Sequence, residues 1–241
     1  MNLGNSNNAV VSAQNVTKRF GDVVCLKQVN LEVGAGEKVA VVGGNGSGKT
    51  VLLDVLCGFV RPNSGNVFLN GVITKGRHPA WFSRHGIIRT FQSPRVFEQM
   101  AIEECLTLAG WVPEHPGLWS SLVRNRWYTQ RHASALGDAQ RALAFAGWEQ
   151  YAGQQAGQLS YGERKFLTIL QLTLAKGDVA ICDEPAAGLD STQATRVIEM
   201  LDRWHSEQEN RALIVATHDL EYVSEAFDRT YRISDGHLLE A

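Results

Sequence analysis

Residues 43–50 decide the fold of this chain, and they read Gly43-Gly44-Asn45-Gly46-Ser47-Gly48-Lys49-Thr50. The stretch fits the pattern G-x-x-x-x-G-K-S/T, in which glycines let backbone N–H groups surround phosphate oxygens. We expect Lys49 to neutralise β- and γ-phosphate charge and the Thr50 hydroxyl to ligate Mg²⁺. A β-branched-rich run at 39–42 precedes the loop and an apolar segment follows it, as a strand and a helix would.

A pair of carboxylates, Asp183 and Glu184, directly follows a second apolar run at 179–182. Ligands bind at the carboxyl ends of strands in open α/β sheets. We therefore expect Asp183 to hold Mg²⁺, directly or through water, and Glu184 to polarise the attacking water as a general base. Alone, such a pair would also suit a solvated strand end. Combined with the phosphate loop, it predicts a nucleoside triphosphatase, and the missing N-K-x-D sequence of GTPases favours ATP.

The rest of the chain predicts an α/β fold with a helical insertion. A third apolar run at 213–216 is similar to 39–42 and 179–182, as expected for strands buried on both faces of a parallel sheet. Helical patterns lie between them. From about Gln92 to Leu159 the sequence contains no buried-strand pattern, and apolar residues there recur at helical spacing.

Composition excludes several classes of protein. The 241 residues carry 23 Lys and Arg against 25 Asp and Glu, which argues against binding to nucleic acid through counterion release. No apolar run reaches the length of a transmembrane helix, and the first eight residues lack a secretory signal, so we expect a cytosolic chain. We expect the four cysteines to be reduced and mostly buried, because none forms a C-x-x-C pair.

The sequence becomes recognisable at residues 159–163, Leu159-Ser160-Tyr161-Gly162-Glu163, which resemble the LSGGQ signature of ABC-type ATPases. Other marks of that family occur in order from Val10 to about Leu239. Phe20 resembles the aromatic residue that stacks on adenine, and Gln92 resembles the Q-loop glutamine that completes Mg²⁺ coordination. Residues 187–190 resemble the D-loop, and His218 resembles the switch histidine that reaches the γ-phosphate.

The resemblance implies a P-loop NTPase (RecA-like) core with a mostly parallel sheet, N-terminal antiparallel strands and an inserted helical subdomain. Residues 1–241 would form one ABC ATPase domain with a flexible tail (1–8), a nucleotide-binding core (9–91 and 160–241) and a helical subdomain (92–159). Its cofactors would be ATP and Mg²⁺. The implied catalytic residues are Glu184, His218 and Gln92, and the implied metal ligands are Thr50, Gln92 and Asp183. The implied nucleotide contacts are Phe20, Gly43, Asn45, Gly46, Ser47, Gly48, Lys49, Thr50, Val51, Ser160, Gly162 and Asp190.

The signature also implies a second subunit. In the family, the signature serine, here Ser160, and the Gly162 backbone bind the γ-phosphate held by the opposite ATPase. The chain has one phosphate loop and one signature, so two ATP sites require two such subunits related by a two-fold axis. The partner would be identical or a paralogue.

Departures from the common signature suggest a subgroup. Tyr161 replaces the usual glycine and Glu163 the usual glutamine, and LSYG resembles the branched-chain amino acid importer subgroup. Residues 58–59, 89–92 with 95–97, and 185–190 also resemble that subgroup or its urea-importing relatives. This implies import of a small polar solute, with membrane permease subunits, a periplasmic solute-binding protein and a place on the cytoplasmic face of the inner membrane. The alternatives are an exporter ATPase for lipid or polysaccharide and a soluble ABC ATPase acting on nucleic acid. Residues 111–132, rich in Trp and Arg, suit a membrane-surface or partner-facing patch, or a locally packed helix pair with a solvated basic face.

Overall fold

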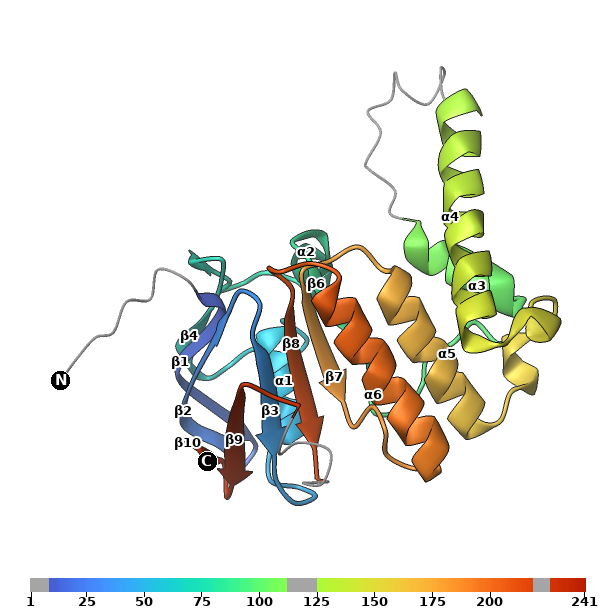
Figure 1. Ribbon diagram of the computed structural model, residues 1–241. Helices are drawn as coiled ribbons and strands as arrows, with labels where there is room; N and C mark the ends of the chain where they lie inside the picture. The colour runs from blue at the N-terminus through green and yellow to red at the C-terminus, as the bar shows by residue number, and fades with distance from the viewer. Residues whose placement is uncertain (1–8, 112–124, 219–225) are drawn as a thin grey trace. The chain divides into compact units, whose positions relative to one another are not determined.

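The computed structural model describes residues 9–111, 125–218 and 226–241, with side chains for all of these except 125–129. The chain divides into two compact units. The first unit comprises Met1–Gln92, Gly177–Ala187 and Leu201–Ala241, and the second comprises Ser93–Lys176 and Gly188–Met200. Each unit is described on its own below (Figure 1).

The first unit is built on a six-stranded sheet with the order β10-β9-β3-β8-β7-β6. All pairs are parallel except β10 with β9. Strands β3, β7 and β8 are buried along almost their whole length, which confirms the three strands predicted from apolar runs. The strands are β3 (Lys38–Val42), β6 (Ile87–Arg89), β7 (Val179–Asp183), β8 (Ala212–Thr217), β9 (Arg229–Ser234) and β10 (His237–Glu240).

A second sheet in the same unit is antiparallel, with the order β2-β1-β4-β5. It confirms the predicted N-terminal antiparallel strands. Apolar side chains alternate along β2, where Leu26, Val29, Leu31 and Val33 are buried, as expected for a sheet covered on one face. The strands are β1 (Ala9–Phe20), β2 (Val23–Gly34), β4 (Ser64–Leu69) and β5 (Val72–Ile73).

Helix α1 (Lys49–Leu56) joins the two sheets into one core. Its buried leucines Leu52, Leu53 and Leu56 belong to one hydrophobic cluster with residues of β1 and β2 and of β3 and β8. Burying each such side chain contributes about 1.5–3 kcal/mol. The core therefore fixes the helix that follows the phosphate loop. The short helix α2 (Pro79–Arg84) lies between β5 and β6 in the chain and packs through Phe82.

The second unit is helical. Helices α3, α4 and α5 pack against one another, and Ala135, Ala139 and Leu143 form the buried face of α4. Between 92 and 159, the described residues contain no strand beyond an isolated bridge of Ala101 with Gln155. The helices are α3 (Ile102–Gly110), α4 (Asn125–Ala146), the 3₁₀ turns η3 (Glu149–Tyr151) and η4 (Ala156–Gln158), α5 (Tyr161–Leu174) and α6 (Ser191–Ser206), which passes into the first unit.

The boundary between the units differs from the predicted one. Helix α5 and the start of α6 cluster with the helical unit, whereas the sequence prediction assigned 160–241 to the nucleotide-binding core. The physical reason is that α5 packs on α3 and α4. The predicted tail 1–8 and most of the Trp- and Arg-rich segment lie outside the described residues. Within the described residues, no helix is both long enough and apolar enough to cross a membrane.

Candidate active site

The phosphate loop connects the carboxyl end of β3 to the first turn of α1, and close backbone contacts require glycine at two of its positions, Gly43 and Gly48. Gly48 has φ 111°, and a Cβ added to it would lie 2.6 Å from the carbonyl oxygen of Cys25. A Cβ on Gly43 would lie 2.5 Å from the carbonyl oxygen of Ile233. A side chain at either position would push the loop out of place. The positive φ of Gly48 also turns the loop into the helix N-terminus, where backbone N–H groups favour an anion.

Lys49 begins α1, and its side chain lies back along the loop. Its Nζ donates hydrogen bonds to the carbonyl oxygens of Gly43 (2.7 Å) and Gly44 (3.2 Å). The same ammonium lies 3.3 Å from Oε1 of Glu184, and both side chains are buried. A buried cation at the N-terminus of a helix is a suitable counter-charge for phosphate.

A cavity of about 380 Å³ opens beside the loop, within the range of about 300–1,000 Å³ of ligand pockets. It brings together the loop, Gln92 and Glu184, which are far apart in the sequence. The lining also includes Gly44, which the sequence analysis names only as part of the loop, and Cys25, which it does not assign to the site. The whole lining is Cys25, Gly44, Asn45, Gly46, Gly48, Lys49, Thr50, Val51, Gln92 and Glu184.

Glu184 is held in a left-handed backbone conformation with φ 50°, which is uncommon for a residue with a side chain. Its N–H donates to the carbonyl oxygen of Ala216 at 2.8 Å, which ties the end of β7 to β8. Its Oε2 lies 2.7 Å from Nδ1 of His218, and its Oε1 faces Lys49. The carboxylate is therefore oriented from both sides. Such backbone strain concentrates at functional sites.

Asp183 is 1% exposed, and its two carboxylate oxygens have different surroundings. Oδ2 lies 3.3 Å from Nη2 of Arg89, while Oδ1 has no hydrogen-bond partner among the described residues. The same Nη2 lies 3.1 Å from Oδ1 of Asp54 on α1. A buried carboxylate oxygen that lacks a protein partner is a suitable ligand for a hard divalent cation.

The three predicted metal ligands offer oxygen donors, which are the kind that Mg²⁺ prefers. Thr50 and Gln92 line the nucleotide cavity, whereas Asp183 is not among its lining residues. Among the described residues, no three His, Cys, Asp or Glu side chains form a metal cluster.

Phe20 lies outside the lining of the cavity. It ends β1, its side chain is 48% exposed, and Nζ of Lys18 lies 4.5 Å from the ring centroid. The Phe20 ring is therefore exposed at the surface of the first unit, and it makes a cation–π contact with Lys18. Its role in stacking on adenine stays a prediction.

The predicted signature contacts lie in the second unit. Ser160 caps α5: its Oγ accepts from the N–H of Glu163 (3.3 Å), and Oε2 of Glu163 accepts from the N–H of Ser160 (2.8 Å). A Cβ on Gly162 would lie 3.2 Å from Oε1 of Gln193, whose N–H donates to Oδ1 of Asp190 at 2.9 Å. The structure therefore brings the first turn of α5 together with the start of α6.

Sequence reasoning missed Arg89 as a member of the site. The residue stands in the Arg89-Thr90-Phe91-Gln92 stretch that carries the family resemblance, but nothing in that stretch shows its two carboxylate partners. The pairing arises because β6 lies beside β7, and the end of β7 lies against α1. The neighbouring thiols Cys57 and Cys182 are buried, and this burial raises the pKa of both to about 12.

Comparison with known proteins gives consistent results. A family model described as ABC transporter matches residues 26–187. The high-affinity branched-chain amino acid transport ATP-binding protein LivG of Escherichia coli (strain K12) is 30% identical over 227 residues, covering 94% of this chain and 89% of LivG. The corresponding protein BraF of Pseudomonas aeruginosa is 28% identical, with the same coverage of 94% and 89%.

Solved structures show the same fold. A nucleotide-free ATP-binding cassette from an ABC transporter superposes with a TM-score of 0.78 at 25% identity, covering 97% of this chain and 91% of that one. A dimeric cassette in a post-hydrolysis state bound to ADP and Pi superposes with a TM-score of 0.79 at 23% identity, covering 96% and 97%. The family model matches well over half of the chain, and the fold and the phosphate loop agree with it. The chain therefore belongs to the ABC transporter family, as an ATP-binding and ATP-hydrolysing subunit.

Proposed function

We propose that the chain energises the import of branched-chain amino acids or another small polar solute. Two observations support this solute class: the LSYG signature at Leu159–Gly162, and the similarity to LivG and BraF, both branched-chain amino acid transport proteins by name. The observation that carries the ATPase chemistry is the position of Glu184, oriented by Lys49 and His218 at the mouth of the phosphate loop.

In the proposed mechanism, the loop amides and Lys49 bind the β- and γ-phosphates. Glu184 accepts a proton from a water molecule as the water oxygen forms a bond to the γ-phosphorus. The bond from the γ-phosphorus to the bridging oxygen breaks, and ADP and phosphate result. His218 keeps the Glu184 carboxylate directed at the water, and as a donor it meets charge that develops on the γ-phosphate.

Thr50, Gln92 and Asp183 are the proposed ligands of Mg²⁺, directly or through water. When bound, the cation neutralises phosphate charge. Within this arrangement, Asp183 offers its unpartnered Oδ1, while Arg89 holds Oδ2 and so fixes the orientation of the carboxylate. Phe20 is the proposed platform for the adenine ring.

We further propose that the active form is a dimer. Ser160, Gly162 and Asp190 would contact the nucleotide bound by a second ABC ATPase, identical or paralogous, and the dimer would close on ATP and open after hydrolysis. The helical unit and the segment after Gln92 would dock on membrane permeases. The chain would then work at the cytoplasmic face of the inner membrane, and a periplasmic protein would deliver the solute.

Glu184→Gln tests the chemistry. It removes the proton acceptor but keeps the side chain's size, so we expect turnover to fall by about 10²- to 10⁴-fold while ATP still binds. Phosphate release and equilibrium binding of labelled ATP measure the two effects. The matched variant Glu199→Gln changes an exposed side chain outside the cavity and should hydrolyse ATP at close to the normal rate. Undiminished hydrolysis by Glu184→Gln would contradict the role of general base.

The direction of transport needs a separate experiment. The chain is reconstituted with its co-purifying permeases, and ATP-dependent movement of labelled leucine and of urea is followed into and out of vesicles. We expect ATP-dependent transport of the labelled solute away from the side of the membrane that carries the solute-binding protein. The Glu184→Gln variant should lose this transport. ATP-driven movement of lipid or polysaccharide in the opposite direction would favour the exporter alternative.

A further inference from the structure

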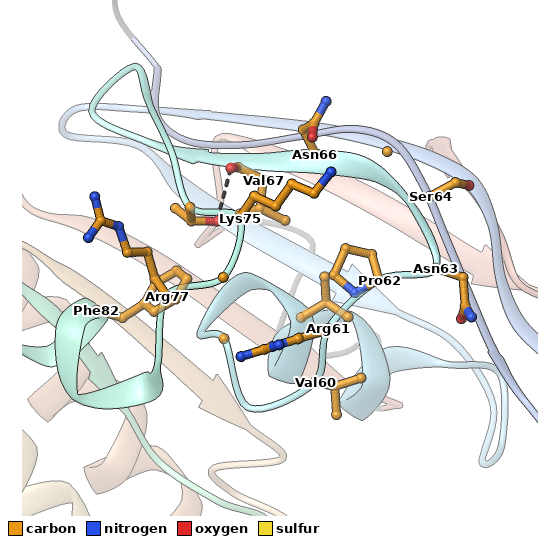
Figure 2. A pocket seen from close by; sticks show the side chains of 15 residues that line it. Val60, Arg61, Pro62, Asn63, Ser64, Asn66, Val67, Lys75, Arg77 and Phe82 are labelled. Atoms are coloured by element: carbon orange, nitrogen blue, oxygen red, sulfur yellow. Dashed lines mark hydrogen bonds between the residues drawn. The ribbon is translucent and has the colours of Figure 1, made fainter.

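The first unit contains a second cavity, of about 430 Å³, that shares no lining residue with the nucleotide cavity among the described residues (Figure 2). Three segments form its walls: the end of α1 with the turn that follows it, the start of β4, and residues 74–77 after β5. The ring of Phe82 from α2 completes the lining. Its volume is that of a small-molecule site.

The walls of this cavity are fixed in position. Both the N–H and the Oγ1 of Thr74 donate to the carbonyl oxygen of Val67, at 2.9 and 3.0 Å, which holds residues 74–77 on β4. Gly58 has φ 73°, and a Cβ there would lie 2.2 Å from the Phe82 ring. The ring therefore packs directly on the turn after α1. The cavity is pre-formed, which lowers the ordering cost of binding a ligand.

The charge of the lining is one-sided. Arg61, Lys75 and Arg77 contribute three cations, and the lining contains no carboxylate. The whole chain carries 23 Lys and Arg against 25 Asp and Glu, so the positive charge of this lining differs from the nearly neutral charge of the whole chain. In the described part of the chain, none of the three cations forms a salt bridge. Like charges around a concave surface raise its positive potential and attract an anion.

The geometry of the cavity combines charge with apolar and hydrogen-bonding surface. Figure 2 shows Lys75 and Arg61 on opposite walls. The guanidinium of Arg77 lies over the ring of Trp81, at 5.1 Å from its centroid, so it is oriented without a carboxylate. Asn63 and Asn66 add amide groups, and the half-buried Val60 and Pro62 add apolar surface, whereas the Phe82 ring is buried behind the wall.

We propose that this cavity binds a small organic phosphomonoester. A guanidinium group donates paired hydrogen bonds to phosphate oxygens, and the exposed side chains of Arg61 and Arg77 each bring one to the lining, where Lys75 adds a mobile point charge. The three cations more than offset the charge of a phosphate dianion. Val60 and Pro62 in the lining are half-buried and offer apolar surface to an organic group, which distinguishes this ligand class from inorganic phosphate. The site is separate from ATP hydrolysis and does not depend on the solute assigned above.

The probe for the test is phenyl phosphate, and phenol is its matched neutral control. Both are titrated into the full chain by calorimetry and ligand-observed NMR. ADP and Mg²⁺ are added only to the concentration that saturates the nucleotide cavity, because free ADP is itself an organic phosphate. We expect phenyl phosphate to bind at least about tenfold more tightly than phenol, and its affinity to fall as salt is added. Equal affinities for the two probes would overturn the proposal. Failure of the chain to bind phenyl phosphate would also overturn it if the chain fails to bind phosphatidic acid in the vesicle experiment described below.

The matched variants separate this site from general surface charge. Arg61→Ala, Lys75→Ala and Arg77→Ala together should weaken phenyl phosphate binding at least about tenfold. Arg84→Ala, Lys176→Ala and Arg196→Ala together remove the same charge from exposed positions outside the cavity and should change it less than about twofold. Equal losses in the two triple variants overturn the proposal. Unfolding midpoints establish that both variants fold.

A vesicle experiment distinguishes the source of the phosphate group. Vesicles of phosphatidylcholine with phosphatidic acid are compared with pure phosphatidylcholine in flotation with the chain. Retention by phosphatidic acid that is lost in the Arg61, Lys75 and Arg77 variant, without binding of phenyl phosphate, assigns the phosphomonoester to a lipid headgroup. Binding of phenyl phosphate without such retention assigns it to a soluble molecule.

Discussion

At the scale of single residues, Arg89 is the buried cation that pairs with two carboxylates of the site. One of its amino groups lies 3.1 Å from Asp54 and 3.3 Å from Asp183, and its side chain is almost fully buried. Its Nε and Nη1 have no partner in the described part of the chain. Buried charges are costly unless they are paired, so removing this cation would leave two carboxylates in a dry environment.

Arg89→Met should therefore lower the free energy of unfolding by about 3–5 kcal/mol. Arg89→Lys keeps the charge but loses the planar fork, so we expect a smaller loss. Urea denaturation without nucleotide measures both. The exposed Arg84→Met serves as the control and should change stability by less than about 0.5 kcal/mol. If Arg89→Met were as stable as the unmodified chain, Asp183 would not depend on this ion pair.

At the scale of elements, the first turn of α5 shows why Glu163 is suited to its position. Its carboxylate accepts from the N–H of Ser160, and the Ser160 hydroxyl accepts from the N–H of Glu163. The reciprocal pair satisfies two backbone donors, one of them an N–H that an α-helix otherwise leaves free in its first turn. A carboxylate there also interacts favourably with the helix dipole.

Glu163→Ala should therefore cost about 1 kcal/mol of stability, whereas Glu163→Gln should cost a few tenths, because glutamine can still accept the bond. Thermal unfolding of the two variants, compared with the unmodified chain, measures the difference. Equal stability of the alanine and glutamine variants would show that the capping box contributes little. Since Glu163 caps the helix that carries Ser160, the alanine variant is also a check on how rigidly the signature must be held.

The elements that could be predicted from sequence are those whose burial is uniform. Strands β3, β7 and β8 are covered on both faces, so their apolar runs marked them to within about a residue. The phosphate loop, Asp183 and Glu184 were predictable because residue type and spacing carry their chemistry. The role of Arg89 could not be predicted, because its ion pairs connect residues of β6, β7 and α1 that are far apart in the sequence. The place of α5 in the helical unit likewise depends on tertiary packing.

At the scale of the whole molecule, the chain supplies one phosphate loop and one signature, in different compact units. We expect ATP to bring two ATPase subunits together. Ser160→Arg should prevent this association, because a bulky cation replaces a small exposed hydroxyl, without unfolding the chain. Light scattering with ATP, in a Glu184→Gln background that slows turnover, measures the dimer.

The control for this prediction is Gln150→Arg, which places the same side chain at another exposed position of the second unit. It should dimerise normally with ATP. An ATP-dependent dimer of undiminished affinity in Ser160→Arg would count against a signature contact across the subunits.

Cys25 gives the nucleotide cavity an intrinsic chemical reporter. It lines the cavity and is half-buried, whereas Cys57, Cys105 and Cys182 are buried and have pKa values raised by burial. At neutral pH those three thiols have very little reactive thiolate. We expect iodoacetamide to alkylate the native chain at Cys25, excess ADP to slow the reaction, and mass spectrometry to locate the label. Equal labelling with and without ADP would contradict this, and Cys25→Ser is the blank. Occupancy of the nucleotide cavity then becomes measurable as a rate of covalent modification, without an added fluorophore.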